Sequence, residues 1–107
     1  MSKGILVGLC TCPADETAER LARTLVAEKL AACVNVLPAA TSIYEWRGEV
    51  AADPERLLVI KTREERWEAL ETRIRELHPH ELPEVIAVRV EKGSGAYLDW
   101  VLEQTSA

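Results

Sequence analysis

The stretch from Ala31 to Thr62 reads AACVNVLPAATSIYEWRGEVAADPERLLVIKT, and its pattern is typical of two long β-strands joined by a turn. β-Branched and aromatic residues are frequent in both halves. Gly48 supplies the backbone freedom that a tight turn between the strands needs. Pro38 predicts a bulge or an edge position in the first strand, and residues 51–54 leave open whether the second strand is continuous.

The segments on either side of this hairpin predict further strands and helices. An apolar run at 5–12 has the length of a central strand that is buried on both faces, and another strand is expected at 85–90. Between the first strand and the hairpin, apolar residues recur at three- and four-residue steps. This spacing predicts an amphipathic helix with Pro13 in its first turn. Residues 97–102 predict a short closing helix.

A second main helix is expected directly after the hairpin. Thr62 and Glu65 match the capping box that starts a helix, and Pro79 ends the helix at the preceding residue. The order of elements is therefore βαββαβ followed by a short C-terminal helix. Right-handed crossovers place both main helices on one face of an antiparallel sheet, which predicts an α+β, ferredoxin-like sandwich with an extended hairpin, as a single domain over residues 1–107.

The hairpin is longer than the helices that would cover it. A helix of ~15 residues spans ~22 Å, whereas a strand of ~14 residues spans ~46 Å. The uncovered part is either an exposed edge that invites aggregation or a subunit interface, and an interface is the better interpretation. We therefore expect the chain to associate with copies of itself through four residues of the hairpin, namely Ile43, Tyr44, Trp46 and Val50.

Composition and charge exclude several classes of partner. The net charge of −5 and the lack of a Lys/Arg cluster argue against nucleic acid. No apolar run approaches the ~20 residues that span a bilayer, and no export signal is recognisable, so we expect a cytoplasmic protein without a membrane partner. The three cysteines are an odd number in a chain without such a signal, which predicts reduced thiols instead of a disulfide framework.

Thiol and imidazole groups form the first candidate site. Cys10 and Cys12 are two residues apart on a strand, so their side chains point to the same face, and thiolates with imidazoles suit copper or zinc. Each residue also has a structural alternative. Cys10 can be a small buried core residue, Cys12 is expected to be exposed at the strand end, and His78 can cap the C-terminus of its helix.

Polar residues near strand ends and after Pro79 form the second candidate site. They are expected to line a ligand-binding cleft between subunits and comprise Asn35, Lys61, His80, Glu81, Glu84 and Tyr97. The alternative is a local role, in which Lys61 is a solvated strand-end charge and Asn35 bonds the bulged backbone near Pro38.

In combination, several motifs resemble the CutA family of divalent-cation tolerance proteins, in order and over nearly the whole chain. They are the segment 28–35, Ser42 to Tyr44 with Trp46 and Gly48, Lys61 with Thr62, His78 with Pro79, Pro83 with Glu84, and the segment 97–100. The resemblance implies a ferredoxin-like protomer in a tight cytoplasmic homotrimer whose long strands pair between subunits. It also implies a link to tolerance of copper and other divalent metals, and no established catalytic activity.

The resemblance further implies a copper site at Cys10 and His78. Family members with such a site have a second histidine where this chain has Leu77, so either His80 or a neighbouring subunit has to supply the missing ligand. Two other departures are Glu45, at a position that is often aromatic in the family, and His80, at a position that is usually tyrosine.

These observations favour a homotrimeric, non-catalytic protein of divalent metal tolerance that binds a soft metal weakly. The metal is not expected to be needed for folding, and no obligatory protein partner is expected. The alternative is a trimeric regulatory or scaffold module that binds a small anionic metabolite or a protein in the clefts between subunits. The sequence contains no recognisable motif that combines a nucleophile with a base, and no glycine-rich phosphate-binding loop, so it gives no positive evidence for an enzyme. A ferredoxin-fold acylphosphatase is a more remote alternative, because Asn35 has no arginine to accompany it.

Overall fold

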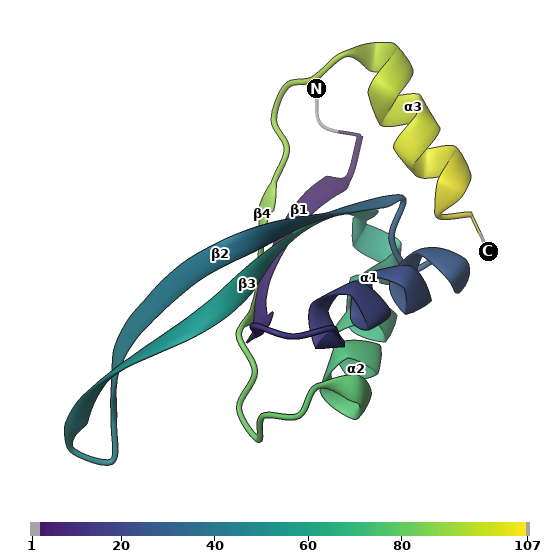
Figure 1. Ribbon diagram of the computed structural model, residues 1–107. Coiled ribbons are helices and arrows are strands. Elements are labelled where there is room, and N and C mark those ends of the chain that lie inside the picture. Colours follow the sequence, from purple (N-terminus) through teal and green to yellow (C-terminus); the bar gives the residue numbers. More distant parts are fainter. Residues whose placement is uncertain (1–2, 107) are drawn as a thin grey trace.

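The computed structural model describes residues 3–106, which form a four-stranded antiparallel sheet with the order β2-β3-β1-β4 (Figure 1). The strands are β1 (Ile5–Pro13), β2 (Cys33–Trp46), β3 (Glu49–Arg63) and β4 (Val85–Arg89). The helices are α1 (Thr17–Ala27), which follows β1, α2 (Trp67–Leu77), which follows β3, and α3 (Gly95–Gln104), which closes the chain. This is the predicted ferredoxin-like arrangement with an added C-terminal helix.

Helices α1 and α2 cover one face of the sheet and bury the main core against it (Figure 1). Apolar residues one turn apart on each helix meet alternate residues of the strands, as the two periodicities require. The fully buried members of this core are Ala18, Leu25, Leu70 and Ile74 from the helices and Cys10, Cys12, Leu58 and Ile60 from the sheet. None of the helices within residues 3–106 is long and apolar enough to cross a membrane.

Helix α3 packs on the opposite face of the sheet, at the end where β1 begins. Leu98 and Val101 from the helix join Ile5 and Ala32 in a second buried cluster. Ile5 has the opposite parity in β1 to Cys10 and Cys12, so its side chain points away from α1 and α2. Within residues 3–106, no helix packs on the rest of this face, and Ile86 and Val88 of β4 are 54% and 61% exposed there.

The hairpin of β2 and β3 projects from the sheet as a two-stranded ribbon (Figure 1). Strand β3 runs without a break through residues 51–54, whereas β1 pairs with it only from Glu55 onward. The predicted bulge lies in β2 between Leu37 and Ala40, around Pro38. The turn carries positive φ angles at Arg47 (52°) and Gly48 (85°). The molecule is consequently elongated, with extents of 44 × 25 × 23 Å.

The prediction that Pro13 opens the first helix is wrong. Pro13 is the last residue of β1 and pairs with Glu55, and α1 begins four residues later at Thr17. A proline is tolerated there because β4 pairs with β1 only as far as Cys10, which leaves one side of the strand end without a ladder. Asp15 still acts at the start of the helix, since its Oδ1 accepts a 2.8 Å hydrogen bond from the Thr17 amide.

The predicted capping box at Thr62 is also wrong. Thr62 is a fully buried residue of β3, and its Oγ1 donates a 2.7 Å hydrogen bond to the carbonyl of Leu30. A 3-10 turn at Glu64–Arg66 then leads into α2 at Trp67, and neither the turn nor the helix has a side-chain cap. The threonine hydroxyl therefore ties β3 to the segment after α1 instead of starting α2.

Candidate metal centre

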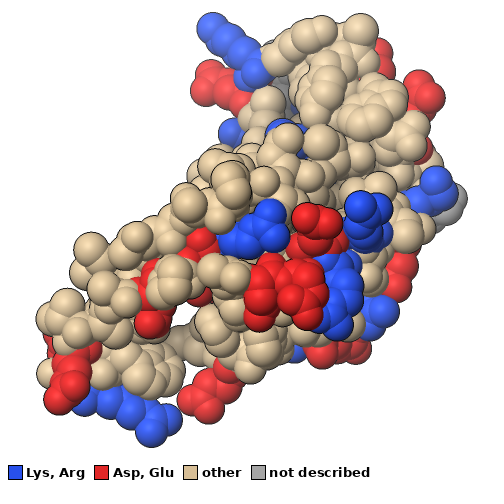
Figure 2. Space-filling view, viewed as in Figure 1, with Lys and Arg blue, Asp and Glu red and all other residues tan. Residues whose placement is uncertain are grey.

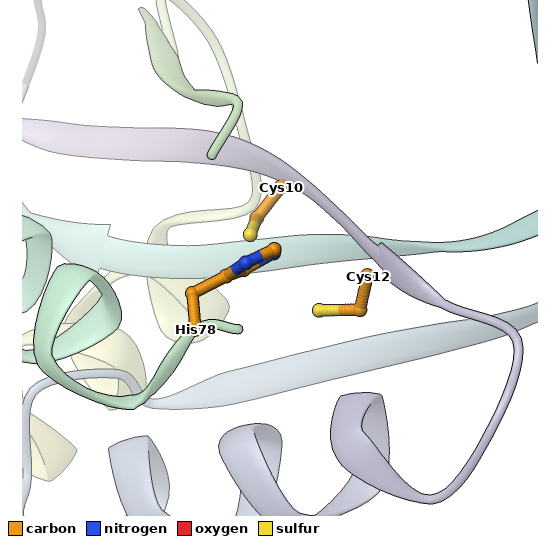
Figure 3. A group of neighbouring side chains, drawn as sticks. All are labelled: Cys10, Cys12 and His78. Atoms are coloured by element: carbon orange, nitrogen blue, oxygen red, sulfur yellow. The ribbon is translucent and has the colours of Figure 1, made fainter. Parts of the chain in front are cut away.

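Three side chains with metal-binding atoms meet between β1 and the end of α2 (Figure 3). Cys10 and Cys12 project from the same face of β1 toward His78, and the three candidate ligand atoms lie within 4.8 Å of one another. All three residues are buried, with exposed fractions of 0% for both cysteines and 7% for the histidine. We refer to Cys10, Cys12 and His78 as the thiol-imidazole cluster.

Local sequence explains why these residues converge. The two-residue spacing puts both thiols on the helix-covered face of β1, as predicted. Pro79 follows the last residues of α2, and His78 leaves the helix with an extended ψ of 136°, which directs the chain back over β1. The prediction that Cys12 is exposed is wrong, because the main core extends to the end of the strand and covers it.

Both ring nitrogens of His78 have hydrogen-bond partners. Nε2 lies 2.7 Å from the carbonyl oxygen of Thr11, which can only accept, so Nε2 carries the proton. Nδ1 accepts a 3.1 Å hydrogen bond from the backbone amide of His80. These two hydrogen bonds hold the imidazole against the backbone of β1. A metal ion has to displace one of these two contacts in order to bind the ring.

The two thiols influence each other's proton affinity. The hydrogen bond between them raises the pKa of Cys10, as do burial and the negative charges of Cys12, Glu84 and Glu55. The same hydrogen bond lowers the pKa of Cys12. Because a thiol must lose its proton to bind a metal, metal binding at this pair releases protons and depends on pH.

The donor set fits a soft or borderline metal ion. Two sulfurs and one imidazole nitrogen match the preferences of Cu(I) and Zn(II), while the hard ions Mg²⁺ and Ca²⁺ prefer oxygen. A tetrahedral ion with bonds of about 2.3 Å to sulfur separates two sulfurs by about 3.8 Å. The cluster, at up to 4.8 Å, therefore has to contract slightly around an ion.

Leu77, which stands where the family has a second histidine, and His80, its suggested substitute, both lie outside this cluster. Leu77 is 39% exposed and borders a small groove beside α1. His80 has its ring centroid 4.8 Å from that of His78, but it contributes its backbone amide to His78 and its side chain is exposed. Cys12 instead supplies the third donor. The two-residue spacing in the sequence already indicated a shared face, but the expected exposure of Cys12 concealed its role.

The six predicted cleft residues fall into separate places. His80, Glu81 and Glu84 border a cleft of about 560 Å³ between the hairpin and the segment 80–84. Lys61 donates a hydrogen bond to Asn35 on the neighbouring strand, away from that cleft. Tyr97 packs against Trp100 on α3, and burial together with the nearby Cys33 raises its pKa.

The four residues expected at a subunit interface all lie on the projecting ribbon. Their exposed fractions are 71% for Ile43, 43% for Tyr44, 42% for Trp46 and 78% for Val50. Tyr44 donates a hydrogen bond to the Asp53 carboxylate across the ribbon, which fixes its ring. Three of the four, Ile43, Tyr44 and Trp46, also border the cleft.

The chain is a small α+β protein with a ferredoxin-like fold and a projecting hairpin. Its buried pair of thiols faces an imidazole, and these groups are suitable donors for a soft divalent or monovalent metal ion. Residues 6–104 match the family described as CutA1 divalent ion tolerance protein. The chain therefore belongs to this family.

Individual relatives agree with this assignment. The chain is 46% identical over 99 residues to the divalent-cation tolerance protein CutA of Thermus thermophilus, covering 92% of this chain and 96% of that one. It is 46% identical over 97 residues to protein CutA of Homo sapiens, of which it spans 54%. The crystal structure of CutA from Xylella fastidiosa superposes with a TM-score of 0.95 at 41% identity, covering 97% of this chain and 100% of that one.

Proposed function

We propose that this chain is a homotrimeric, non-catalytic protein of the cytoplasm that acts in divalent metal tolerance by binding copper or another soft metal ion. The observation that carries the proposal is the convergence of Cys10, Cys12 and His78 within 4.8 Å. The names of the relatives associate the family with divalent cation tolerance, and this donor set provides the chemistry for it.

Binding at this site is weak compared with a structural zinc site. A metal ion displaces a hydrogen bond of the His78 ring and at least one thiol proton, and both losses reduce the net affinity. The cluster also contains three protein donors instead of the four that a closed structural site uses. A reversible site of this kind suits buffering of a metal and does not make folding depend on it.

Reduced thiols support a cytoplasmic location. Cys10, Cys12 and Cys33 are all free, and none is paired with another. A reducing compartment keeps such thiols available for a metal ion, whereas an oxidising one promotes their modification.

Burial of the cluster supports a non-catalytic role. A cysteine beside a histidine is also the arrangement of a nucleophile and its base. Here both sulfurs are 0% exposed, and the His78 ring is fixed on backbone groups on both sides. A bare ion can reach such donors through small local motions, but an organic substrate cannot be placed against them.

Exposed apolar surface supports assembly. The ribbon exposes Ile43 and Val50, and the uncovered sheet face exposes Ile86 and Val88. Contact with another chain removes such exposed apolar side chains from water, which favours association. The number of subunits, three, comes from the resemblance to the family.

Metal titration by calorimetry tests the proposal. Cu(I) held in a reducing buffer, or Zn(II), is titrated into the wild type and into Cys10→Ser, Cys12→Ser and His78→Gln. The matched control is Cys33→Ser, which makes the same chemical change outside the cluster. We expect the three cluster variants to weaken binding and the control to leave it unchanged. Equal binding by all four variants, or none by the wild type, contradicts direct binding at the cluster.

A further inference from the structure

The cleft beside the ribbon is separate from the thiol-imidazole cluster. It lies between the hairpin and the segment 80–84, and Figure 2 shows acidic side chains around the hollow at this end of the molecule. Thr11, which borders it, stands between Cys10 and Cys12 in β1 and so points to the opposite face of the sheet. The remaining lining residues are Ser42, Ile43, Tyr44, Trp46, Glu55, His80, Glu81, Leu82 and Glu84.

Glu55 is the most unusual residue of this cleft. Its side chain lies in β3 where the ribbon joins the sheet, and only 9% of the residue is exposed. Its cross-strand neighbours are Pro13 and Ala40, whose side chains cannot donate a hydrogen bond. Within residues 3–106, Glu55 takes part in no side-chain hydrogen bond or ion pair.

The carboxylate oxygens of Glu55 are not fully enclosed, so a group that enters the cleft can reach them. A largely buried carboxylate without a partner is only partly hydrated, and an incoming positive group would stabilise it. The basic groups near Glu55 are engaged elsewhere. Arg56, the next residue, donates to the carbonyl of Asp15 at 3.3 Å. Arg47 reaches Glu81 at 3.8 Å, at the tip of the ribbon. A positive group from outside the chain is therefore the natural partner of Glu55.

The other lining residues narrow the chemistry of that partner. Glu84 adds a second carboxylate without a basic partner in the described part of the chain, so an anionic ligand is disfavoured here. No set of three carboxylates within residues 3–106 converges closely enough to hold a metal ion. Tyr44 and Trp46 offer aromatic faces, which attract organic cations, and a volume of about 560 Å³ lies in the usual range for small-molecule sites.

We propose that this cleft binds an ammonium or guanidinium group carried on a short apolar chain. Glu55 is the buried anchor, Glu84 a second contact, and Tyr44 and Trp46 cover the apolar part. Since these aromatic residues are also proposed for subunit contact, the cation has two sources with the same chemistry. It is either a free amine or a basic side chain of a second copy.

Calorimetry with spermidine and agmatine tests whether a free amine occupies the cleft. The wild type is compared with Glu55→Gln, which keeps size and hydrogen-bonding capacity but removes the charge. Glu45→Gln serves as the matched control, because Glu45 is exposed on the same ribbon and does not border the cleft. We expect Glu55→Gln to weaken amine binding about tenfold or more, the control to leave it unchanged, and higher salt to weaken it in the wild type.

Native mass spectrometry of the same three proteins tests whether a basic side chain of a second copy occupies the cleft. If its basic side chain fills the cleft, added amines do not bind, and Glu55→Gln dissociates at a higher concentration than the wild type and Glu45→Gln. The proposal is overturned if Glu55→Gln matches Glu45→Gln in both amine binding and assembly. Copper titration of Glu55→Gln should match that of the wild type, because the thiol-imidazole cluster is intact in this variant. This result would show that the cleft and the cluster are independent sites.

Discussion

Replacing Cys12 by alanine removes one of the two sulfur donors and leaves the other two in place. A structural zinc site with four protein ligands contributes about 10–16 kcal/mol, or about 2.5–4 kcal/mol for each ligand. Loss of one sulfur from a three-donor cluster should therefore weaken metal binding roughly a hundredfold or more. The sulfur is fully buried, so the variant also leaves a small cavity, and we expect a stability loss of about 1 kcal/mol.

The assay is a competition titration against a chromogenic chelator of known affinity, without oxygen and with a phosphine reductant. Circular dichroism of each variant verifies that the fold is retained. Cys33→Ala is the control, since Cys33 is partly exposed and lies outside the cluster. If Cys12→Ala binds as tightly as this control while Cys10→Ala does not, then Cys12 is only a core residue and the three-donor site is refuted.

Three further predictions concern assembly, stability and pH. Trp46→Asp should raise the dissociation constant of the assembly by at least about thirtyfold, which corresponds to the loss of a hot spot of about 2 kcal/mol. Val26→Asp on α1 should leave this constant unchanged. If analytical ultracentrifugation shows that the Trp46 variant assembles as tightly as the wild type, the ribbon is not the interface. Thr62→Val should lower the free energy of unfolding, measured in urea, by about 1–3 kcal/mol, because the buried Leu30 carbonyl loses its hydrogen-bond donor. The control Thr41→Val, on the exposed ribbon, should lower it far less. Equal losses of stability in the two variants would contradict the role of the Thr62 hydroxyl. Zinc affinity should rise by up to about tenfold per pH unit for each thiol proton displaced, because the pKa of Cys10 is raised and its proton must leave before the sulfur can bind. In Cys10→Ala, the increase of affinity with pH should be smaller by the contribution of this one proton. An identical pH profile in both proteins argues against Cys10 as a ligand.

Most of the fold was predictable because its elements follow simple spacing rules. The periods of two and about 3.6 residues placed the core faces correctly, and Pro38 correctly indicated the bulge. The length of the hairpin relative to the helices indicated a ribbon that leaves the sheet. These features depend on local sequence and on chain dimensions, which require no knowledge of the neighbours in space.

The errors concern residues whose role is decided by neighbours far along the chain. Thr62 matched a helix start, but a carbonyl 32 residues away takes its hydroxyl. Pro13 suited a first helical turn, but pairing with β3 extends the strand through it. Cys12 stands at a strand end, where exposure is the usual expectation, yet the core reaches that far. Tertiary contacts overrode local preference in each case.

The candidate sites show the same division. The shared face of Cys10 and Cys12 followed from strand geometry, but their distance from His78 depends on how the end of α2 crosses β1. Glu55 carried no signal in the sequence, because a glutamate in a polar stretch of the hairpin is expected to be solvated. Only the junction of ribbon and sheet buries it.

X-ray absorption at the zinc edge, on the protein loaded with less than one equivalent of Zn(II), tests the thiol-imidazole cluster most directly. Scattering from two sulfurs at about 2.3 Å and one imidazole nitrogen at about 2.0 Å is expected, because these are the donors that converge and the usual bond lengths to zinc. The same spectrum of Cys12→Ala should contain one sulfur. A first shell of nitrogen and oxygen alone, with no sulfur in the wild type, would contradict metal binding at this cluster.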